Sequence, residues 1–136
     1  MWLFDPAVVG KQCYVQVKQT RESGYRKGDY EGRCGYVISV SDPRSALETS
    51  LEREANVQFD GDDKTEITAF PVRYLVPVPP SNLKDLVLAL DGSKKGQMLV
   101  VEGISGAYCV VSSVPPGVMF EMSKDALVQI RRSEEV

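Results

Sequence analysis

Histidine is absent: none of the 136 residues is a histidine. Histidine is the commonest general base near neutral pH and the commonest protein ligand for metal ions. Its absence therefore argues against most hydrolytic and metal-dependent enzymes. We expect a non-enzymatic binding protein that uses no cofactor and no metal ion.

Cysteines and long apolar stretches are also scarce. Cys13, Cys34 and Cys109 lie too far apart for a Cys-x-x-Cys motif, and such an odd, scattered set favours reduced thiols in an intracellular protein. No apolar run approaches the roughly 20 residues that span a bilayer. The apolar start Met1–Phe4 lacks the basic residues of a secretory signal. The sequence predicts a soluble protein without membrane contact.

An excess of positive charge is missing as well. The 16 Lys and Arg residues stand against 19 Asp and Glu, which leaves a formal net charge of −3. This balance provides no whole-molecule attraction to a polyanion, so any contact with nucleic acid must be local. Hydrophobic residues at 43% and charged residues at 26% are ordinary for a folded chain of one or two small domains.

Short strand patterns dominate what is present. In residues 11–18 the apolar residues Cys13, Val15 and Val17 alternate with polar ones, which predicts a half-buried strand with Cys13 facing the core. The polar residues 19–29 predict a long loop. Further strands are expected over residues 36–40, 56–59, 66–70, 75–78, 86–90, 98–101, 107–112 and 118–122, with one helical turn over 71–74.

Residues 41–54 interrupt the strand pattern. Asp42 could cap a short helix whose first residue is Pro43, and a polar loop is the alternative. The acidic residues Asp60, Asp62, Asp63 and Glu66 lack the order of a calcium-binding EF-hand, so a hairpin turn accounts for them.

A proline-rich stretch over residues 76–81 divides the chain. Three prolines within four residues cannot lie in a central strand, and they favour an extended linker. A polyproline ligand segment is the alternative. We therefore place the first domain at residues 1–78, including the insertion 41–54, and the second at residues 79–136.

The two halves repeat two features in the same order. The spacing Gly-x-x-Gly-x-Val-x-x-Val that begins at Gly32 is matched by Gly-x-x-Leu-x-Val-x-x-Ile from Gly96. The closing segment at residues 75–78, LVPV, is matched by LVQI at 127–130. This order predicts one supersecondary unit used twice. We expect an all-β chain of two small SH3-like antiparallel barrels in tandem.

The glycine turn over Glu31–Val37 resembles the KOW motif, in which a polar residue and glycine precede Gly-x-Val and an apolar strand. Residues 95–101 carry a weaker copy, with Leu99 in place of the second glycine. The tandem is similar to the C-terminal KOW array of the NusG-related elongation factor DSIF. This resemblance implies a nuclear protein whose partners are RNA polymerase, elongation factors, and RNA or DNA.

Basic residues with tyrosines among them surround the first long loop. Such a loop suits phosphate contact and base stacking, although its acidic residues make a solvated loop the alternative. The candidate nucleic-acid-binding residues are Lys18, Arg21, Tyr25, Arg26, Lys27 and Arg33 in the first half, with Lys94 and Lys95 in the second.

A second hypothesis uses the aromatic residues. Tyr25, Tyr30, Tyr36 and Phe59 would form a cage for methylated lysine, as in Tudor-type barrels, which bind a cation through their ring faces. Simple core packing of these rings is the third explanation. The sequence thus leaves two functions open: a KOW-type module for the transcription machinery, and an SH3- or Tudor-type module for a peptide or histone tail.

Overall fold

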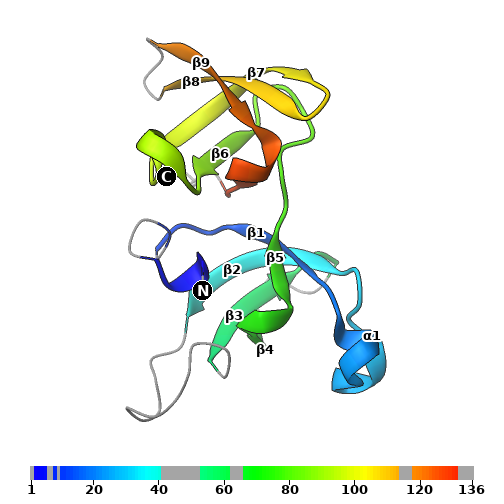
Figure 1. Cartoon of the computed structure of the whole chain (residues 1–136). Coiled ribbons are helices and arrows are strands. Elements are labelled where there is room, and N and C mark those ends of the chain that lie inside the picture. Colours follow the sequence, from blue (N-terminus) through cyan, green and yellow to red (C-terminus); the bar gives the residue numbers. More distant parts are fainter. Residues whose placement is uncertain are drawn as a thin grey trace. The chain divides into compact units, whose positions relative to one another are not determined.

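The strand-rich sequence forms two five-stranded antiparallel sheets, one in each of two units, Met1–Val76 (unit 1) and Pro77–Val136 (unit 2) (Figure 1). The structure is a computed structural model, and it describes residues 2–5, 8, 10–40, 53–61, 66–113 and 118–131. The two sheets confirm the predicted all-β tandem of small barrel-like domains.

In unit 1 the strand order is β4-β3-β2-β1-β5. Its strands are β1 (Tyr14–Val17), β2 (Cys34–Val40), β3 (Glu54–Phe59), β4 (Thr68–Pro71) and β5 (Leu75–Pro77). Cys13, Val15 and Val17 are completely buried. The alternation predicted for residues 11–18 is therefore confirmed, and Cys13 faces the core.

The connections of unit 1 contain more helical turns than the sequence suggested. Residues 19–29, predicted as a loop, include the single helical turn α1 (Thr20–Ser23) and the 3₁₀ turn η2 (Tyr25–Gly28). The predicted turn over 71–74 is the 3₁₀ turn η3 (Val72–Tyr74). The helix predicted after Asp42 lies outside the described residues, and so does the hairpin turn predicted over residues 61–64, apart from Gly61. The strand β3 begins at Glu54, the last residue of the insertion predicted over 41–54. The predicted insertion is therefore one residue too long at this end.

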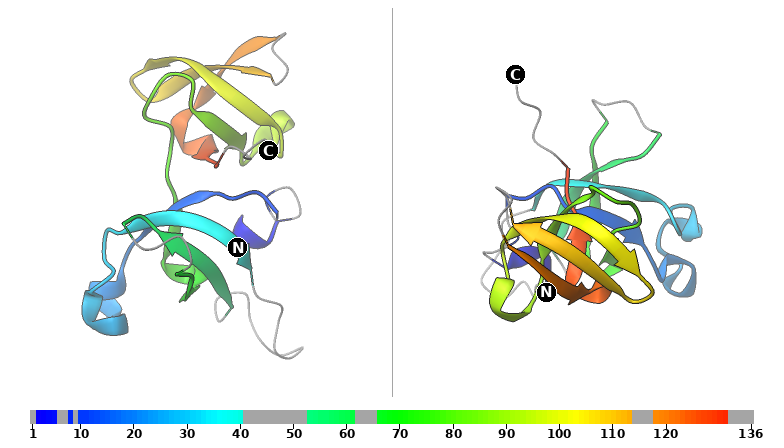
Figure 2. Two further views of the ribbon diagram at one scale, coloured as in Figure 1. Left: turned by 180° about the vertical axis from the view of Figure 1, so that it is seen from behind. Right: turned by 90° about the horizontal axis from the view of Figure 1, so that it is seen from above.

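In unit 2 the strand order is β10-β6-β7-β8-β9, which is the order of unit 1 read from the other edge. Its elements are β6 (Leu86–Ala89), η4 (Gly92–Lys94), β7 (Met98–Ser105), β8 (Tyr108–Ser113), β9 (Met119–Ser123), η5 (Lys124–Ala126) and β10 (Leu127–Gln129). The twisted meander β7–β8–β9 is yellow to orange in Figure 2. It packs Leu99, Val101 and Val111 into a dry core.

The same glycine turn begins the second strand of each unit. The amide of Gly32 donates a hydrogen bond to the carbonyl of Val17, and the amide of Gly96 donates to that of Ala89, both at 2.9 Å. The two glycines have φ values of +82° and +86°. Side chains other than glycine rarely adopt this conformation, so both turns require a glycine at this point.

A second hydrogen bond, at equivalent positions of the two units, links the end of the first strand to the last 3₁₀ turn of each unit. After the first strand, the amide of Lys18 donates to the carbonyl of Tyr74 at 2.8 Å, and the amide of Leu90 donates to that of Ala126 at 2.8 Å. Tyr74 ends η3 and Ala126 ends η5. Equivalent positions therefore hold a large aromatic residue in unit 1 and a small one in unit 2.

At a further pair of equivalent positions, Gly35 of unit 1 and Leu99 of unit 2, the small residue of each cross-strand pair lies on a different strand. Gly35 lies opposite Phe59 across β2 and β3. Leu99 lies opposite Ser113 across β7 and β8. A Cβ atom on Gly35 would stand 2.5 Å from the carbonyl oxygen of Gln58 and 2.7 Å from the Cα atom of Phe59. The two strands of unit 1 therefore approach too closely there for any side chain.

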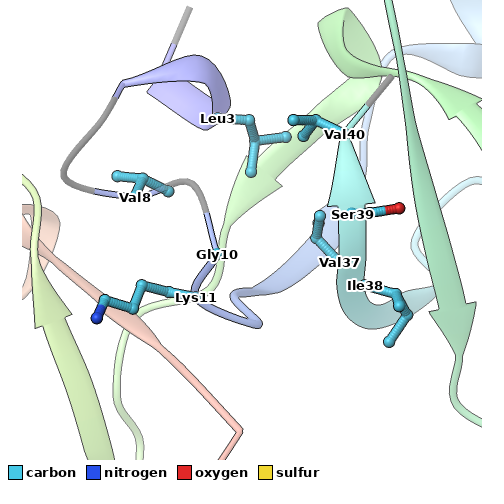
Figure 3. A pocket seen from close by; sticks show the side chains of 8 residues that line it. All are labelled: Leu3, Val8, Gly10, Lys11, Val37, Ile38, Ser39 and Val40. Atoms are coloured by element: carbon cyan, nitrogen blue, oxygen red, sulfur yellow. The ribbon is translucent and has the colours of Figure 1, made fainter. Parts of the chain in front are cut away.

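A small cavity lies beside the N-terminal 3₁₀ turn η1 (Trp2–Phe4). Leu3 and Val8 line it together with Val37 and Val40 of β2 (Figure 3). Its volume of about 20 Å³ accommodates roughly one water molecule. We interpret it as a packing gap in the core and not as a ligand site.

Gly35→Ala should destabilise unit 1 by about 1–3 kcal/mol, because the added Cβ forces β2 and β3 apart. Gly103→Ala is a matched control within a strand, since a Cβ there would meet nothing closer than Val110 at 3.7 Å. We expect a change within about 0.5 kcal/mol for this control. Urea unfolding, followed by Trp2 fluorescence for unit 1 and far-UV circular dichroism for both units, measures the two values. Equal losses would contradict the close approach at Gly35.

Candidate binding site for a cationic side chain

Glu31 anchors the connection between β1 and β2. Its carboxylate accepts hydrogen bonds from the amide of Thr20 at 2.8 Å and from the hydroxyl of Thr20 at 2.7 Å. The amides of Gln19 and Arg21 donate to it at 3.3 Å. These amides belong to the start of α1, where a helix lacks internal acceptors. The hydrogen bonds, with that from the Thr20 side chain foremost, lower the pKa of Glu31.

Five aromatic rings meet beside this connection, and we name them the aromatic cluster: Tyr25, Tyr30, Phe59, Phe70 and Tyr74. The centroid of the Phe70 ring lies 5.1 Å from that of Tyr25 and 5.4 Å from that of Tyr30. It lies 5.8 Å from Phe59 and 6.1 Å from Tyr74. Phe70 is therefore the centre of the cluster.

Burial divides the cluster into a base and a rim. Phe59, Phe70 and Tyr74 are buried, whereas Tyr25 and Tyr30 are only half-buried. The buried base comes from β3, β4 and η3, and the rim comes from the β1–β2 connection. This connection lies at the end of unit 1 opposite the N-terminal turn (Figures 1 and 2). The rim rings are thus the ones that a ligand can reach.

A positive charge already lies among the rings. The Cζ atom of Arg26 is 5.6 Å from the ring centroid of Tyr25, 5.4 Å from that of Tyr30 and 5.9 Å from that of Phe70. All three distances are within the range of cation–π attraction. Hydrogen bonding with Tyr25 raises the pKa of the Arg26 guanidinium. Three rings of the cluster therefore form a cage that accommodates one cation, and we name it the three-ring cage.

Two further arginines contact other rings of the aromatic cluster. The Cζ atom of Arg33 lies 4.9 Å from the ring centroid of Tyr30 and 5.0 Å from that of Phe59. The Cζ atom of Arg73 lies 4.8 Å from the Tyr74 ring. A hydrogen bond with Ser23, followed by one with Arg73, lowers the pKa of the Tyr74 phenol. These contacts tie the rings to α1 through Ser23 and to Arg33, the residue that precedes β2.

Tyr36 does not belong to the cage, so this part of the sequence hypothesis is wrong. Tyr36 lies directly opposite Tyr14 across β1 and β2, with ring centroids 4.7 Å apart. The hydroxyl of Tyr14 also donates to the carboxylate of Asp60. Because Val37 is buried and successive residues of a strand face opposite sides, Tyr36 points away from the core. The alternation of β2 residues, applied to the sequence, would have excluded Tyr36 from the predicted cage.

Phe70 of the three-ring cage and Tyr74 of the aromatic cluster are the residues that sequence reasoning missed. Both lie in segments whose backbone was predicted, the strand over 66–70 and the helical turn over 71–74. No local pattern shows that the Phe70 ring of β4 meets Tyr25 and Tyr30, which lie 45 and 40 residues earlier in the chain. These rings meet because β1 pairs with both β2 and β5, which places the connection after β1 beside η3.

The predicted nucleic-acid-binding residues divide into three groups. Tyr25, Arg26 and Arg33 belong to the aromatic cluster or lie on it, with Arg26 exposed. Lys18, Arg21 and Lys27 are also exposed in the same connection but lie outside the cluster. In unit 2, the Nζ atom of Lys94 lies 5.0 Å from the Phe120 ring centroid, and Lys95 is exposed. Nucleic-acid binding by these residues stays a prediction.

Unit 2 lacks the rings for an equivalent cage. Met122 and Ala126 stand where unit 1 has Phe70 and Tyr74, as their places before and within η5 show. Tyr108 and Phe120 are the aromatic residues of unit 2. A cavity of about 420 Å³ beside Phe120 occupies this region instead. The three-ring cage is a feature of unit 1.

Over the part of the chain that the structure describes, no three cysteine, aspartate or glutamate side chains are placed to hold a metal ion together. Helices with the length and apolar character needed to cross a membrane are likewise absent from that part. Cys13, Cys34 and Cys109 are free thiols.

No protein-family model and no curated protein matches this chain. Similar solved structures include the SHH1 SAWADEE domain in complex with an H3K9me3 peptide, at 16% identity and a TM-score of 0.32, covering 90% of this chain and 98% of that one. A selenium-substituted Arabidopsis thaliana SHH1 SAWADEE domain with two leucine-to-methionine substitutions is 18% identical at a TM-score of 0.30, covering 92% and 99%. Neither similarity assigns the chain to a family.

Glu31→Gln should make the stability of unit 1 less dependent on pH. The pKa of Glu31 is lower in the folded protein than in the unfolded one. Its carboxylate therefore stabilises the fold above the unfolded pKa of about 4.3 and ceases to do so as the pH falls through the folded pKa. The variant should melt at a lower temperature than the wild type at pH 7, and this difference should shrink below about pH 4.

Glu22→Gln, which changes an exposed carboxylate of α1, is the matched control. Thermal unfolding from pH 7 to pH 3 measures both variants. A pH-dependence of the Glu31→Gln difference that equals that of the control would refute the anchoring role of Glu31.

Proposed function

We propose that this chain is a non-enzymatic, Tudor-type module that binds a peptide by enclosing a cationic side chain, above all a methylated lysine, in the three-ring cage of unit 1. The position of the Arg26 guanidinium carries this proposal. It lies 5.4–5.9 Å from the ring centroids of Tyr25, Tyr30 and Phe70. Three aromatic rings thus surround one place for a cation.

The chemistry of the cage suits methylated ammonium. Aromatic faces carry partial negative charge and attract a cation without offering it hydrogen bonds. An unmodified lysine ammonium is strongly hydrated and loses hydrogen bonds with water when it enters such a site. A trimethylammonium group has no N–H donors to satisfy. The buried base at Phe59 and Phe70 also provides apolar contact for the methyl groups.

The proposed partner is therefore a protein segment that carries methylated lysine, such as a histone tail, and a nuclear location follows from such a partner. Contact with RNA polymerase or elongation factors, which the KOW resemblance implies, remains a separate hypothesis. The exposed residues Lys18, Arg21 and Lys27 in the same connection keep nucleic acid as an alternative outcome of the experiment below.

A lysine-trimethylated peptide should bind at least about fivefold more tightly than the same peptide without methylation. The H3K9me3 peptide and its unmethylated form are a convenient pair, titrated by fluorescence anisotropy. Tyr30→Ala should weaken binding of the methylated peptide by about threefold to thirtyfold, because it removes one wall of the cage. Tyr36→Ala is the matched control on the opposite face of the sheet and should leave the affinity unchanged.

Equal affinities for the two peptides, or full binding by Tyr30→Ala, would refute the proposal. Trp2 fluorescence and far-UV circular dichroism establish that each variant is folded. If single-stranded RNA binds instead, with an affinity that falls steeply as salt rises and is reduced in Arg21→Ala and Lys27→Ala, the connection is a nucleic-acid site.

A further inference from the structure

The place of the ligand in the three-ring cage is taken by a residue of the chain itself. Arg33 reaches Tyr30 and Phe59, and Arg73 reaches Tyr74. Among the cations that the structure describes, Arg26 alone lies over Tyr25, Tyr30 and Phe70 together. Its guanidinium and an incoming methylated ammonium would compete for the same ring faces.

The backbone that positions Arg26 is strained. Arg26 has φ 48° and ψ 34°, and Lys27 has φ 57° and ψ 20°. Residues with a Cβ atom seldom adopt this left-handed conformation singly, and two in succession are rarer still. Such strain persists where surrounding contacts compensate it, and it concentrates at functional sites. The contacts of the Arg26 guanidinium with three rings are the compensation that the structure shows.

The backbone of the segment around Arg26 is hydrogen-bonded to its own turn and not to the sheet. Its backbone hydrogen bonds are local, from the amide of Lys27 to the carbonyl of Gly24 at 3.0 Å and from the amide of Asp29 to the carbonyl of Arg26 at 3.1 Å. Glycines with φ values of +77° and +74° flank it, at Gly24 and Gly28. None of these bonds belongs to the ladder between β1 and β2, so the turn can rearrange while the barrel stays closed.

Building on the proposed function, we propose that Arg26 is an internal competitor of the ligand: its guanidinium fills the three-ring cage in the free protein and leaves when a cationic side chain enters. Two positive charges cannot share one cage, because they repel each other and need the same ring faces. The apparent affinity is then lower than the intrinsic affinity by the fraction of molecules in which the cage is empty. Arg26 thereby lowers the apparent affinity for every ligand that binds in the cage.

Two glycine variants separate this competition from other effects. Arg26→Gly removes the guanidinium and relieves the strained backbone, and it should bind the trimethylated peptide roughly threefold to tenfold more tightly than the wild type. Lys27→Gly is the matched control, since it removes a neighbouring positive charge and relieves the same kind of backbone strain while the guanidinium remains. Its affinity should stay within about twofold of the wild type.

The position of Arg26 can also be measured directly. Ring currents from three aromatic rings should shift the NMR signals of the Arg26 side chain in the free protein. On saturation with the trimethylated peptide these signals should move to the values of a solvent-exposed arginine. This readout does not depend on the affinity of any variant.

The outcomes distinguish the two proposals. If Tyr30→Ala weakens peptide binding as expected but Arg26→Gly binds no more tightly than the wild type, or the Arg26 signals stay shifted at saturation, the competitor role is wrong and the cage function stands. An equal gain in Arg26→Gly and Lys27→Gly would also overturn the competitor role, because charge or strain alone would explain it. If Tyr30→Ala binds like the wild type, the cage function itself fails.

Discussion

The end of the first strand is held from two sides in each unit, and the rest of the unit depends on this constraint. Val17 accepts from the amide of Gly32, and Lys18 donates to Tyr74. Residues 19–31 therefore leave the sheet after Lys18 and return to it at Gly32, which is bonded to Val17. In unit 2 the matching connection is short and passes through one 3₁₀ turn, η4. In unit 1 the longer connection brings two tyrosines over the buried base of the cluster. The same barrel closure thus yields a cage in only one unit.

The energies in this connection are close to balance. A left-handed conformation costs about 1–2 kcal/mol at each residue other than glycine, and both Arg26 and Lys27 adopt it. A cation–π contact at an exposed site contributes about 0.5–1 kcal/mol, and Arg26 makes three. Since the strain and the attraction are of similar size, the Arg26 side chain is only weakly held over the rings. The base beneath it, in contrast, is held by burial of Phe59 and Phe70.

Local patterns predicted most of the strands, because strand alternation and turn glycines act over a few residues. Cys13, Val15 and Val17 show this for β1, and Gly32 and Gly96 mark equivalent turns of the two units. The same rule applied to Tyr36 would have removed it from the proposed cage, since its neighbour Val37 is buried. The connection over residues 19–29 could not be predicted to contain α1, because the start of α1 is bonded to the carboxylate of Glu31, which lies beyond the predicted loop. The intrinsic helix propensity of residues 19–29 alone did not favour helical turns.

By itself the sequence determined the class of the fold, the division into two similar halves and the residues available for a site. Those properties follow from composition, periodicity and the order of short motifs. Only the tertiary structure decided which aromatic residues meet, because Tyr25, Phe59 and Tyr74 come from separate elements and approach one another only when the sheet closes around β1. It also decided that the exposed Arg26 places its guanidinium over the rings. A guanidinium in a polar loop reads from sequence as a solvent-facing charge, and its contact with three rings exists only in the folded unit.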